Sequence, residues 1–320
     1  MTNKIGVITS GGDAPGMNSC LKTVVDIATK RGLEVIAFKR GYNGLVDNNW
    51  QKLTPEDVKL IFSIGGSMIY AGRSISFREY EGKLKAVENL QKLGIDALVI
   101  LGGDGTIKGA NELSKFGIKC YVIPVTIDND VNCTDRSIGF DTAINNAIEM
   151  IDNIKQTMLA NERVLLVEVM GRYKGDIALY SALASESDIV VTPEEPLTKE
   201  QILVKIKKEL KLGNPSPTVV IAEKLFDVPA LAKEFEKELN RECRGIILGY
   251  MQRGGGPTVY DRLLSIRMAN SAIHCVIEKE KSSVICIDKG EIFPMPISKA
   301  IKAPLRVHKK HLALFNEIHN

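Results

Sequence analysis

Acidic side chains of this 320-residue chain stand directly after apolar runs that read as strands. The clearest case is Asp128-Asn129-Asp130, which follows a run that ends at Val125. Two carboxylates two residues apart can serve as a general base and as the group that tunes that base or a nearby metal. The same segment also fits an ordinary solvated turn, because Asp and Asn favour turns. The spacing alone leaves both interpretations open.

Two glycine-rich turns offer a second kind of chemistry. Gly11-Gly12-Asp13-Ala14-Pro15-Gly16 and Gly102-Gly103-Asp104-Gly105-Thr106 each follow an apolar run. Glycine lets the backbone approach an anion, and the helix expected after the first turn supplies free amides. The second turn is not a Walker A loop, and it misses the dinucleotide fingerprint by one residue. Asp104 is suited to Mg²⁺, which takes one or two carboxylates plus phosphate oxygens, although an ordinary turn residue is the alternative.

Arginines and one glutamate occupy comparable places further along the chain. Guanidinium groups bind phosphate oxygens with two parallel hydrogen bonds. An isolated arginine more often forms a surface ion pair, so only a position in a glycine-containing loop after a strand recommends a candidate. The candidates are Arg73, Arg163, Arg172, Arg244 and Arg253. Glu223 ends the apolar run 219–222 and is a candidate acceptor for a substrate hydroxyl.

Composition narrows the chemistry that these residues can perform. The four histidines stand at 274, 308, 311 and 319, so a serine–histidine triad or a histidine-rich metal site would need the C-terminal tail. The segment 308–311 is interpreted as a surface turn. Lys+Arg 42 against Asp+Glu 39 gives +3, which disfavours nucleic acid or an anionic membrane as a partner. Carboxylates, arginines and backbone amides remain, and they point to phosphate chemistry.

The expected compartment is the cytoplasm. The N-terminus shows no signal-peptide pattern, and no apolar run approaches the roughly 20 residues that span a bilayer. The six cysteines contain no Cys-x-x-Cys pair, so neither a zinc site nor a disulfide framework is indicated.

Elements that alternate between strand and helix must position these groups. The expected strands are 5–10, 33–38, 97–101, 120–125, 164–170, 189–191, 219–222, 245–248 and 284–287. The expected helices are 17–31, 84–93, 139–160, 199–211, 228–239 and about 260–278. This alternation predicts an α/β fold with a parallel sheet, in which ligands collect outside the carboxyl ends of the strands.

Five segments, taken in order, resemble the bacterial 6-phosphofructokinases along essentially the whole chain. They are 5–18, Gly102-Gly103-Asp104-Gly105, 126–130, 169–172 and 252–255. A single one is weak, since Gly-Gly-Asp-Gly-Thr also resembles NAD kinases and lipid kinases, but the ordered set is specific. The resemblance implies two three-layer α/β domains with mainly parallel sheets. The nucleotide-binding domain would comprise 1–138 plus about 251–302, and the sugar-phosphate domain 139–250 plus the tail 303–320.

The family transfers the γ-phosphate of ATP to the 1-hydroxyl of fructose 6-phosphate with Mg²⁺, and the resemblance implies this glycolytic reaction here. Asp128 would be the general base with Asp130 in support, Thr126, Arg172 and the Gly11 amide would hold the transferring phosphoryl group, and Asp104 would anchor Mg²⁺. The implied nucleotide side comprises Gly11, Tyr42, Arg73, Ser74, Arg78, Gly103, Asp104, Gly105 and Thr106. The implied sugar side comprises Thr126, Asp128, Arg163, Met170, Gly171, Arg172, Glu223, Arg244, Tyr250 and Arg253. Arg163 and Arg244 would act in a neighbouring subunit, which implies a homotetramer with shared active sites.

Two positions depart from the pattern of the family. Val125 stands where ATP-dependent members usually have glycine and pyrophosphate-dependent relatives lysine, so it supports neither donor. Gly105 favours ATP, because the pyrophosphate-dependent relatives usually have aspartate there. Tyr250 replaces a histidine, and a phenol can hydrogen-bond but carries no positive charge at neutral pH. A pyrophosphate-dependent phosphofructokinase, a tagatose 6-phosphate kinase and a weakly catalytic regulatory paralogue stay open as alternatives.

The effector site implied by the resemblance has lost much of its positive charge. The family binds a nucleoside diphosphate or phosphoenolpyruvate there, between subunits. Lys22 and Lys155 keep their charge. Typical bacterial members have arginine or lysine at the positions of Asp26, Pro55, Leu212 and Asn214. Because fewer cations attract an anion less strongly, we expect control by these effectors to be weak, absent or altered.

Overall fold

Residues 4–319, which the computed structural model describes, divide into two units. The first unit comprises 4–127, 131–141 and 254–305, and the second comprises 128–130, 142–253 and 306–319. The domain bounds implied by the sequence, 1–138 for the first segment, include 128–130 in the first domain. The structure groups them with the second unit, because the side chains of Asn129 and Asp130 bond to residues of that unit.

Within the described residues, the first unit contains a seven-stranded sheet in the order β11-β10-β5-β4-β1-β2-β3. The strands are β1 (Lys4–Thr9), β2 (Glu34–Phe38), β3 (Trp50–Leu53), β4 (Ala97–Gly102), β5 (Lys119–Pro124), β10 (Ser283–Asp288) and β11 (Glu291–Pro296). Only the edge strands β3 and β11 pair antiparallel. Every residue of β4 is buried, because helices cover both faces of a parallel sheet.

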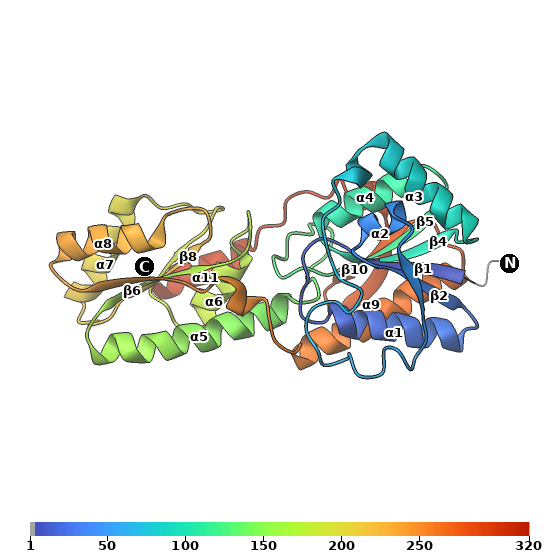
Figure 1. Ribbon diagram of the computed structural model, residues 1–320. Helices are drawn as coiled ribbons and strands as arrows, with labels where there is room; N and C mark the ends of the chain where they lie inside the picture. Colours follow the sequence, from blue (N-terminus) through green and yellow to red (C-terminus); the bar gives the residue numbers. More distant parts are fainter. Residues whose placement is uncertain (1–3, 320) are drawn as a thin grey trace. The chain divides into compact units, whose positions relative to one another are not determined.

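Helices form a layer on each face of this sheet (Figure 1). On one face lie α1 (Met17–Lys30) and α9 (Val259–Ile277), and on the other lie α3 (Tyr80–Lys92) and α4 (Asp104–Ser114). The shorter helices are α2 (Tyr42–Val46), η1 (Ser76–Arg78) and α10 (Ile297–Ala300). Leu90 of α3 and Ile107 of α4 pack with Ile100 of β4 in one buried cluster.

The described part of the second unit contains a four-stranded sheet in the order β7-β8-β6-β9, in which every pairing is parallel. Its strands are β6 (Val164–Val169), β7 (Ile189–Val191), β8 (Thr218–Ala222) and β9 (Cys243–Ile247). Its helices are α5 (Phe140–Ala160), whose first residues belong to the first unit, α6 (Asp176–Ala184), α7 (Lys199–Lys211), α8 (Val228–Leu239), η2 (Gly249–Gln252) and α11 (Lys309–His319). The predicted fold of two three-layer α/β units is confirmed.

The strand order decides where ligands can collect. β1 lies between β2 and β4 in the first sheet, and β6 lies between β8 and β9 in the second. Where consecutive crossovers leave a parallel strand toward opposite sides, a crevice opens at the carboxyl ends. The turns after β1 and β4 therefore share one edge of the first sheet, and the turns after β6, β8 and β9 share one edge of the second.

Each predicted strand and helix is present, with its ends shifted by a few residues. The structure adds elements that the sequence pattern did not predict, among them α4, α6 and α11. α4 contains Gly105 and Gly109, which lower helix propensity, so packing against the sheet rather than local preference forms this helix.

Candidate active site

The loop of the second unit that carries both aspartates is fixed to the segment after β6. Asp130 Oδ2 lies 3.2 Å from Arg172 Nη1, and Asn129 Nδ2 donates to Asp176 Oδ2 over 2.9 Å. Asn129 is 3% exposed and has φ of 50°, so the backbone turns in the left-handed region between the two carboxylates. This burial excludes the ordinary solvated turn.

The pKa of the Asp128 carboxyl lies in the range that suits a general base. Its burial, together with the negative charges of Asp130 and Glu223, raises the pKa of Asp128 to about 6, while Arg172 and Arg253 act in the opposite direction. A carboxyl with this pKa is ionised at neutral pH and still accepts a proton more readily than an ordinary aspartate.

Glu223, directly after β8, organises the turn after β6. Its Oε1 accepts hydrogen bonds from the backbone N–H groups of Gly171 and Arg172, over 3.2 and 2.5 Å. Gly171 has φ of 143°, and a Cβ there would lie 2.4 Å from the carbonyl oxygen of Lys174, so the turn requires glycine. Arg172 has φ of 62°, a strained conformation that these bonds hold. The hydroxyl-binding role predicted for Glu223 would fall to its other carboxylate oxygen.

Gln252 supports the same turn from η2, and sequence reasoning missed it. The side chain is fully buried. Its Oε1 accepts from the Met170 N–H over 3.1 Å, and its Nε2 donates to the Gly249 carbonyl over 3.0 Å. A glutamine beside arginine and glycines gave no sign of burial in the sequence. Gln252 thereby fixes the first residue of the turn, and Glu223 fixes the next two.

Tyr250 and Arg253 lie together on and after η2. Tyr250 is 79% exposed, and the guanidinium of Arg253 lies 5.9 Å from the centroid of its ring. A cation at this distance is attracted by the ring face. The phenol that replaces the histidine of the family pattern therefore stands beside a positive charge without adding one.

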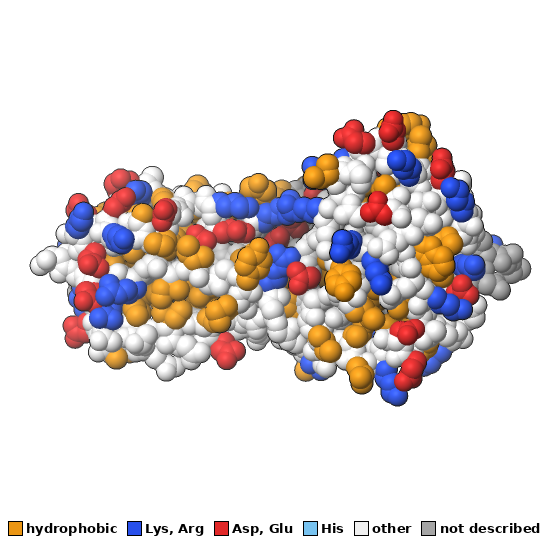
Figure 2. All heavy atoms as spheres, in the orientation of Figure 1, with side chains coloured by type: hydrophobic (Ala, Val, Ile, Leu, Met, Phe, Trp, Pro, Cys, Tyr) orange, Lys and Arg blue, Asp and Glu red, His pale blue; other side chains and the backbone are white. Residues whose placement is uncertain are grey.

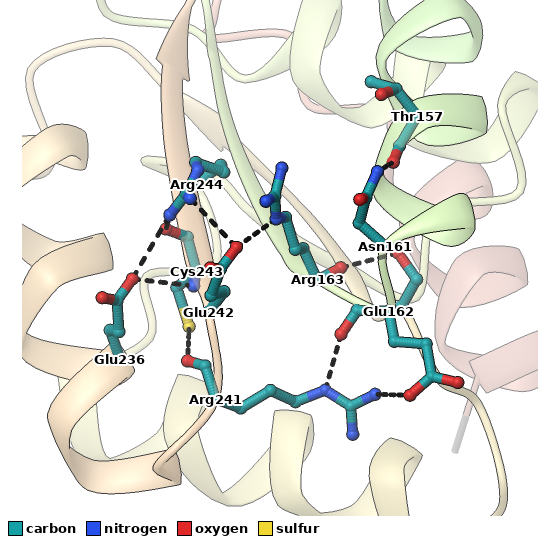
Figure 3. A network of polar contacts seen from close by, with 10 residues as sticks. Thr157, Asn161, Glu162, Arg163, Glu236, Arg241, Glu242, Cys243 and Arg244 are labelled. Atoms are coloured by element: carbon teal, nitrogen blue, oxygen red, sulfur yellow. Dashed lines mark hydrogen bonds and ion pairs between the residues drawn. The ribbon is translucent and has the colours of Figure 1, made fainter.

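Arg163 and Arg244 share one carboxylate, as Figure 3 shows. Glu242 Oε2 bonds to Arg163 Nε and lies 3.0 Å from Arg244 Nη2, and Arg244 Nη1 lies 3.4 Å from Glu236 Oε2. In the part of the chain that the structure describes, both guanidinium groups bond at the starts of β6 and β9, away from the turn that follows β6. The structure thus brings them together with each other and not with Arg172.

The nucleotide-side candidates belong to the first unit, where Tyr42 has a supporting role. Its ring stacks on Phe77 with 4.3 Å between centroids, and it is 5% exposed. Its hydroxyl donates to the Thr106 carbonyl over 2.7 Å, and Thr106 Oγ1 in turn bonds to the Ser10 carbonyl over 3.3 Å. Burial raises the pKa of Tyr42 well above its usual value. Tyr42 therefore supports the turn after β4 through its hydrogen bond to Thr106.

The other candidates for the nucleotide site differ in their hydrogen bonds and exposure. Ser74 Oγ accepts from the Phe77 N–H over 3.1 Å, so this side chain caps η1. The Gly11 N–H donates to the Gly72 carbonyl over 3.1 Å, and it would have to leave that partner to bind a phosphoryl group. Arg73 and Arg78 are exposed, and neither guanidinium forms an ion pair within residues 4–319.

Asp104 and Gly105 begin α4 and follow Gly103 at its N-cap. Asp104 Oδ2 lies 2.7 Å from Lys108 Nζ. Among residues 4–319 no three His, Cys, Asp or Glu side chains gather in a way that could hold a metal, so Mg²⁺ here would rely on nucleotide oxygens and water. A single partly exposed carboxylate at a helix N-terminus fits that donor set. A Cβ at Gly105 would meet nothing within 4 Å, so the fold leaves open space beside this turn.

Val125 and Thr126 continue the chain from β5 in the first unit. Val125 is 1% exposed and pairs with Ile138 in an isolated parallel bridge. Thr126 donates its N–H to the Ile138 carbonyl over 3.0 Å and accepts from Ser137 Oγ over 2.7 Å. The side chain at 125 therefore belongs to the core, which explains valine there by packing.

Comparisons with known proteins agree with this geometry. The sequence model of the family described as Phosphofructokinase matches residues 4–276. The chain is 42% identical over 309 residues to the ATP-dependent 6-phosphofructokinase of Vibrio cholerae, covering 96% of this chain and 97% of that protein. It is 43% identical over 310 residues to the enzyme of the same name from Buchnera aphidicola, covering 97% of each.

Solved structures extend the likeness to the fold. The structure of phosphofructokinase from Saccharomyces cerevisiae matches with a TM-score of 0.85 and 31% identity, covering 99% of this chain and 47% of that one. A pyrophosphate-dependent phosphofructokinase from Nitrosospira multiformis matches with a TM-score of 0.88, but at 17% identity it shows the fold alone. Fold and site together define a two-unit α/β phosphotransferase. The chain belongs to the phosphofructokinase family.

Proposed function

We propose that this chain transfers the γ-phosphate of ATP to the 1-hydroxyl of fructose 6-phosphate and yields fructose 1,6-bisphosphate in glycolysis. The observation that carries the proposal is the Asp128 carboxyl beside Arg172, whose pKa is raised to about 6 by burial and by the charges of Asp130 and Glu223. Relatives that span the whole chain at 42–43% identity are named ATP-dependent 6-phosphofructokinase. The enzyme is thus a kinase of a sugar phosphate.

In this mechanism the residues position and neutralise charge, as phosphoryl transfer demands. Asp128 accepts the proton of the sugar hydroxyl as the hydroxyl oxygen bonds to the γ-phosphorus of ATP. The bond from that phosphorus to the bridging oxygen of the β-phosphate breaks, and ADP leaves with the electron pair. Arg172, held by Asp130 and by the bonds of Glu223 to the turn, stabilises the negative charge on the transferring group. Asp104 would hold Mg²⁺, which supplies further neutralisation of phosphate charge. Tyr250, Arg253 and the backbone of Met170 and Gly171 bind the sugar phosphate.

ATP rather than pyrophosphate is the proposed donor, because the open space beside Gly105 admits nucleotide phosphates. The test is to supply fructose 6-phosphate to the purified protein with ATP or with pyrophosphate as the sole donor and to identify the product. We expect fructose 1,6-bisphosphate with ATP only. Turnover with pyrophosphate alone would overturn the choice of donor, and phosphorylation of tagatose 6-phosphate in preference would overturn the choice of sugar.

The working form is proposed to be a homotetramer in which Arg163 and Arg244 complete the sugar-phosphate site of a neighbouring subunit. Their joint attachment to Glu242 at the strand starts supports this, because it holds them at a distance from their own Arg172 turn. Refolding Arg163→Ala and Asp128→Ser chains together should restore activity that neither chain has alone. Additive residual rates from the mixture would contradict shared sites.

Weak control by anionic effectors is proposed from the remains of the effector site. In the second unit, Lys155 lines a cavity of ≈ 440 Å³ with Asp152, Glu186 and Asp188. Lys155 Nζ donates to the Ser185 and Glu186 carbonyls, over 2.5 and 3.1 Å. In the first unit, Lys22 Nζ lies 2.5 Å from Asp26 Oδ2. Lys22 is thus neutralised by Asp26, and Lys155 is occupied by backbone carbonyls. Strongly sigmoidal fructose 6-phosphate kinetics that ADP relieves would count against the proposal.

The proposed site of action is the cytoplasm. All six cysteines are buried, and none forms a disulfide within residues 4–319, as expected in a reducing compartment. Of the helices in residues 4–319, none combines the length and apolar character needed to cross a membrane. Figure 2 shows acidic and basic side chains interspersed on the visible faces of both units, which supports the expectation that neither nucleic acid nor a membrane is a partner.

A further inference from the structure

His308 lies in the second unit between two side chains one turn apart on α6. Its Nε2 lies 3.3 Å from Asp176 Oδ2, and its Nδ1 lies 3.5 Å from the hydroxyl of Tyr180. The His308 and Tyr180 rings meet edge to face, with 5.5 Å between centroids. The interpretation of 308–311 as a surface turn is wrong, because the His308 side chain is only 16% exposed and residues 309–311 form the start of α11.

The same oxygen of Asp176 that faces His308 accepts the hydrogen bond from Asn129. Asp176 is 3% exposed, and a buried carboxylate is stabilised by each donor or cation that faces it. His308 Nε2 is buried and faces this carboxylate without forming a hydrogen bond to it. Asn129 stands between Asp128 and Asp130 and has a left-handed backbone conformation.

A hydrogen bond also joins the C-terminal segment, residues 306–319, to the residues that follow β6. The buried Lys174 donates from Nζ to the Arg306 carbonyl over 2.9 Å. Lys174 lies two residues after Arg172 and two before Asp176. The segment 172–176 thus bonds to the 128–130 loop through Arg172 and Asp176 and to Arg306 through Lys174, while Asp176 lies beside His308.

We propose that His308 is a positioning residue for phosphoryl transfer, which it aids by fixing Asp176 and, through Asp176, Asn129 and the Asp128 carboxyl. The inference rests on the proposed role of Asp128. The proposal adds a residue of the C-terminal segment to the residues that position Asp128, although that segment provides no proposed catalytic group.

The test compares steady-state kinetics of His308→Ala and His308→Gln in the full-length enzyme. A small displacement of a reacting group lowers the rate about ten- to a hundredfold, so we expect that loss of kcat in His308→Ala, with KM for ATP unchanged. Glutamine restores an N–H toward Asp176, and we expect His308→Gln to recover most of the lost kcat. The control is His319→Gln. His319 lies at the end of α11, with its ring centroid 4.4 Å from that of Phe315, and this variant should keep the wild-type kcat.

A double-mutant cycle with Asp176→Asn separates positioning from packing of the tail. Because His308 acts through Asp176, the double variant should be no slower than Asp176→Asn alone, whereas independent packing effects would add. Wild-type kcat in His308→Ala, or equal loss in the Gln and Ala variants with unchanged thermal stability, would overturn the proposal. Asp128→Ser serves as reference: if it is inactive while His308→Ala is unaffected, the role of Asp128 stands and only this inference falls.

Discussion

Asp130 and Arg172 are joined by an ion pair of 3.2 Å, although 42 positions separate them in the sequence. The two groups have opposite effects on the pKa of Asp128: the carboxylate of Asp130 raises it, and the guanidinium of Arg172 lowers it. Burial is the largest cause of the raised pKa of Asp128, and these two charges shift that pKa in opposite directions, so single substitutions of them should displace it either way.

The acid limb of the pH–rate profile should follow the pKa of Asp128. A base must be ionised to accept a proton, so kcat/KM should fall as the pH drops below about 6. In Asp130→Asn the removal of a neighbouring negative charge lowers the pKa of Asp128, and the limb should move to lower pH. In Arg172→Ala the loss of a cation should move it to higher pH. The measurement is kcat/KM for fructose 6-phosphate across the acid range.

The sugar phosphate itself titrates near pH 6, and it contributes equally to every variant. The displacement between variants is therefore the quantity to compare, not the position of one limb. Limbs that coincide in the wild type and in both variants would show that Asp128 is not the titrating group.

Replacing the base should stabilise the fold. The folded protein binds a proton at Asp128 more tightly than the unfolded chain does, since the pKa rises from 3.8 to about 6. Ionised Asp128 therefore lowers the free energy of unfolding above about pH 6, by up to about 3 kcal/mol, and the penalty vanishes below about pH 4. Asp128→Asn should unfold at higher denaturant concentration near neutral pH and at the same concentration near pH 4. An equal gain at both pH values would contradict the stated cause.

Gly105→Asp should impair use of ATP without harming the fold. The new side chain enters open space, and an acidic residue in the first turn of a helix is neutral or stabilising. Its negative charge would meet the nucleotide phosphates, so KM for ATP should rise about tenfold or more. Gly105→Asn is the control, because it fills similar space without charge and should keep ATP as its donor. Unchanged ATP kinetics in Gly105→Asp would remove this position from the nucleotide site.

Tyr250→His should make sugar binding depend on pH. Tyr250 is exposed beside Arg253, so a histidine there has room and adds a positive charge only when protonated, below about pH 6.5. KM for fructose 6-phosphate should fall a few-fold near pH 6 and match that of the wild type near pH 8. Tyr250→Phe controls for loss of the hydroxyl. A fall of equal size at both pH values would mean that charge is not the cause.

The strands and the turns that follow them were predictable because their signals are local. A buried parallel strand is a short apolar run, and the glycines and acids after it stand next to it in the sequence, so Asp104, Asp128 and Arg172 could be found before any contact was known. The strand order then accounts for their gathering at two sheet edges.

Contacts that link distant segments could not be read in the same way. Gln252 meets Met170 across 82 positions, and nothing in its neighbours marks it as buried. The burial of Tyr42 under Thr106 likewise depends on the packing of α2 against η1 and α4. His308 looked like part of a charged turn because its two partners, Asp176 and Tyr180, lie more than a hundred residues earlier.

The most direct test of the account is the turnover of Asp128→Ser with saturating ATP, Mg²⁺ and fructose 6-phosphate. Loss of a positioned general base should lower kcat by about 10²- to 10⁴-fold, while serine keeps the fold and leaves KM for ATP near its wild-type value. A variant that turns over within about threefold of the wild type would contradict the assignment of Asp128 as the base, and with it the mechanism built on its neighbours.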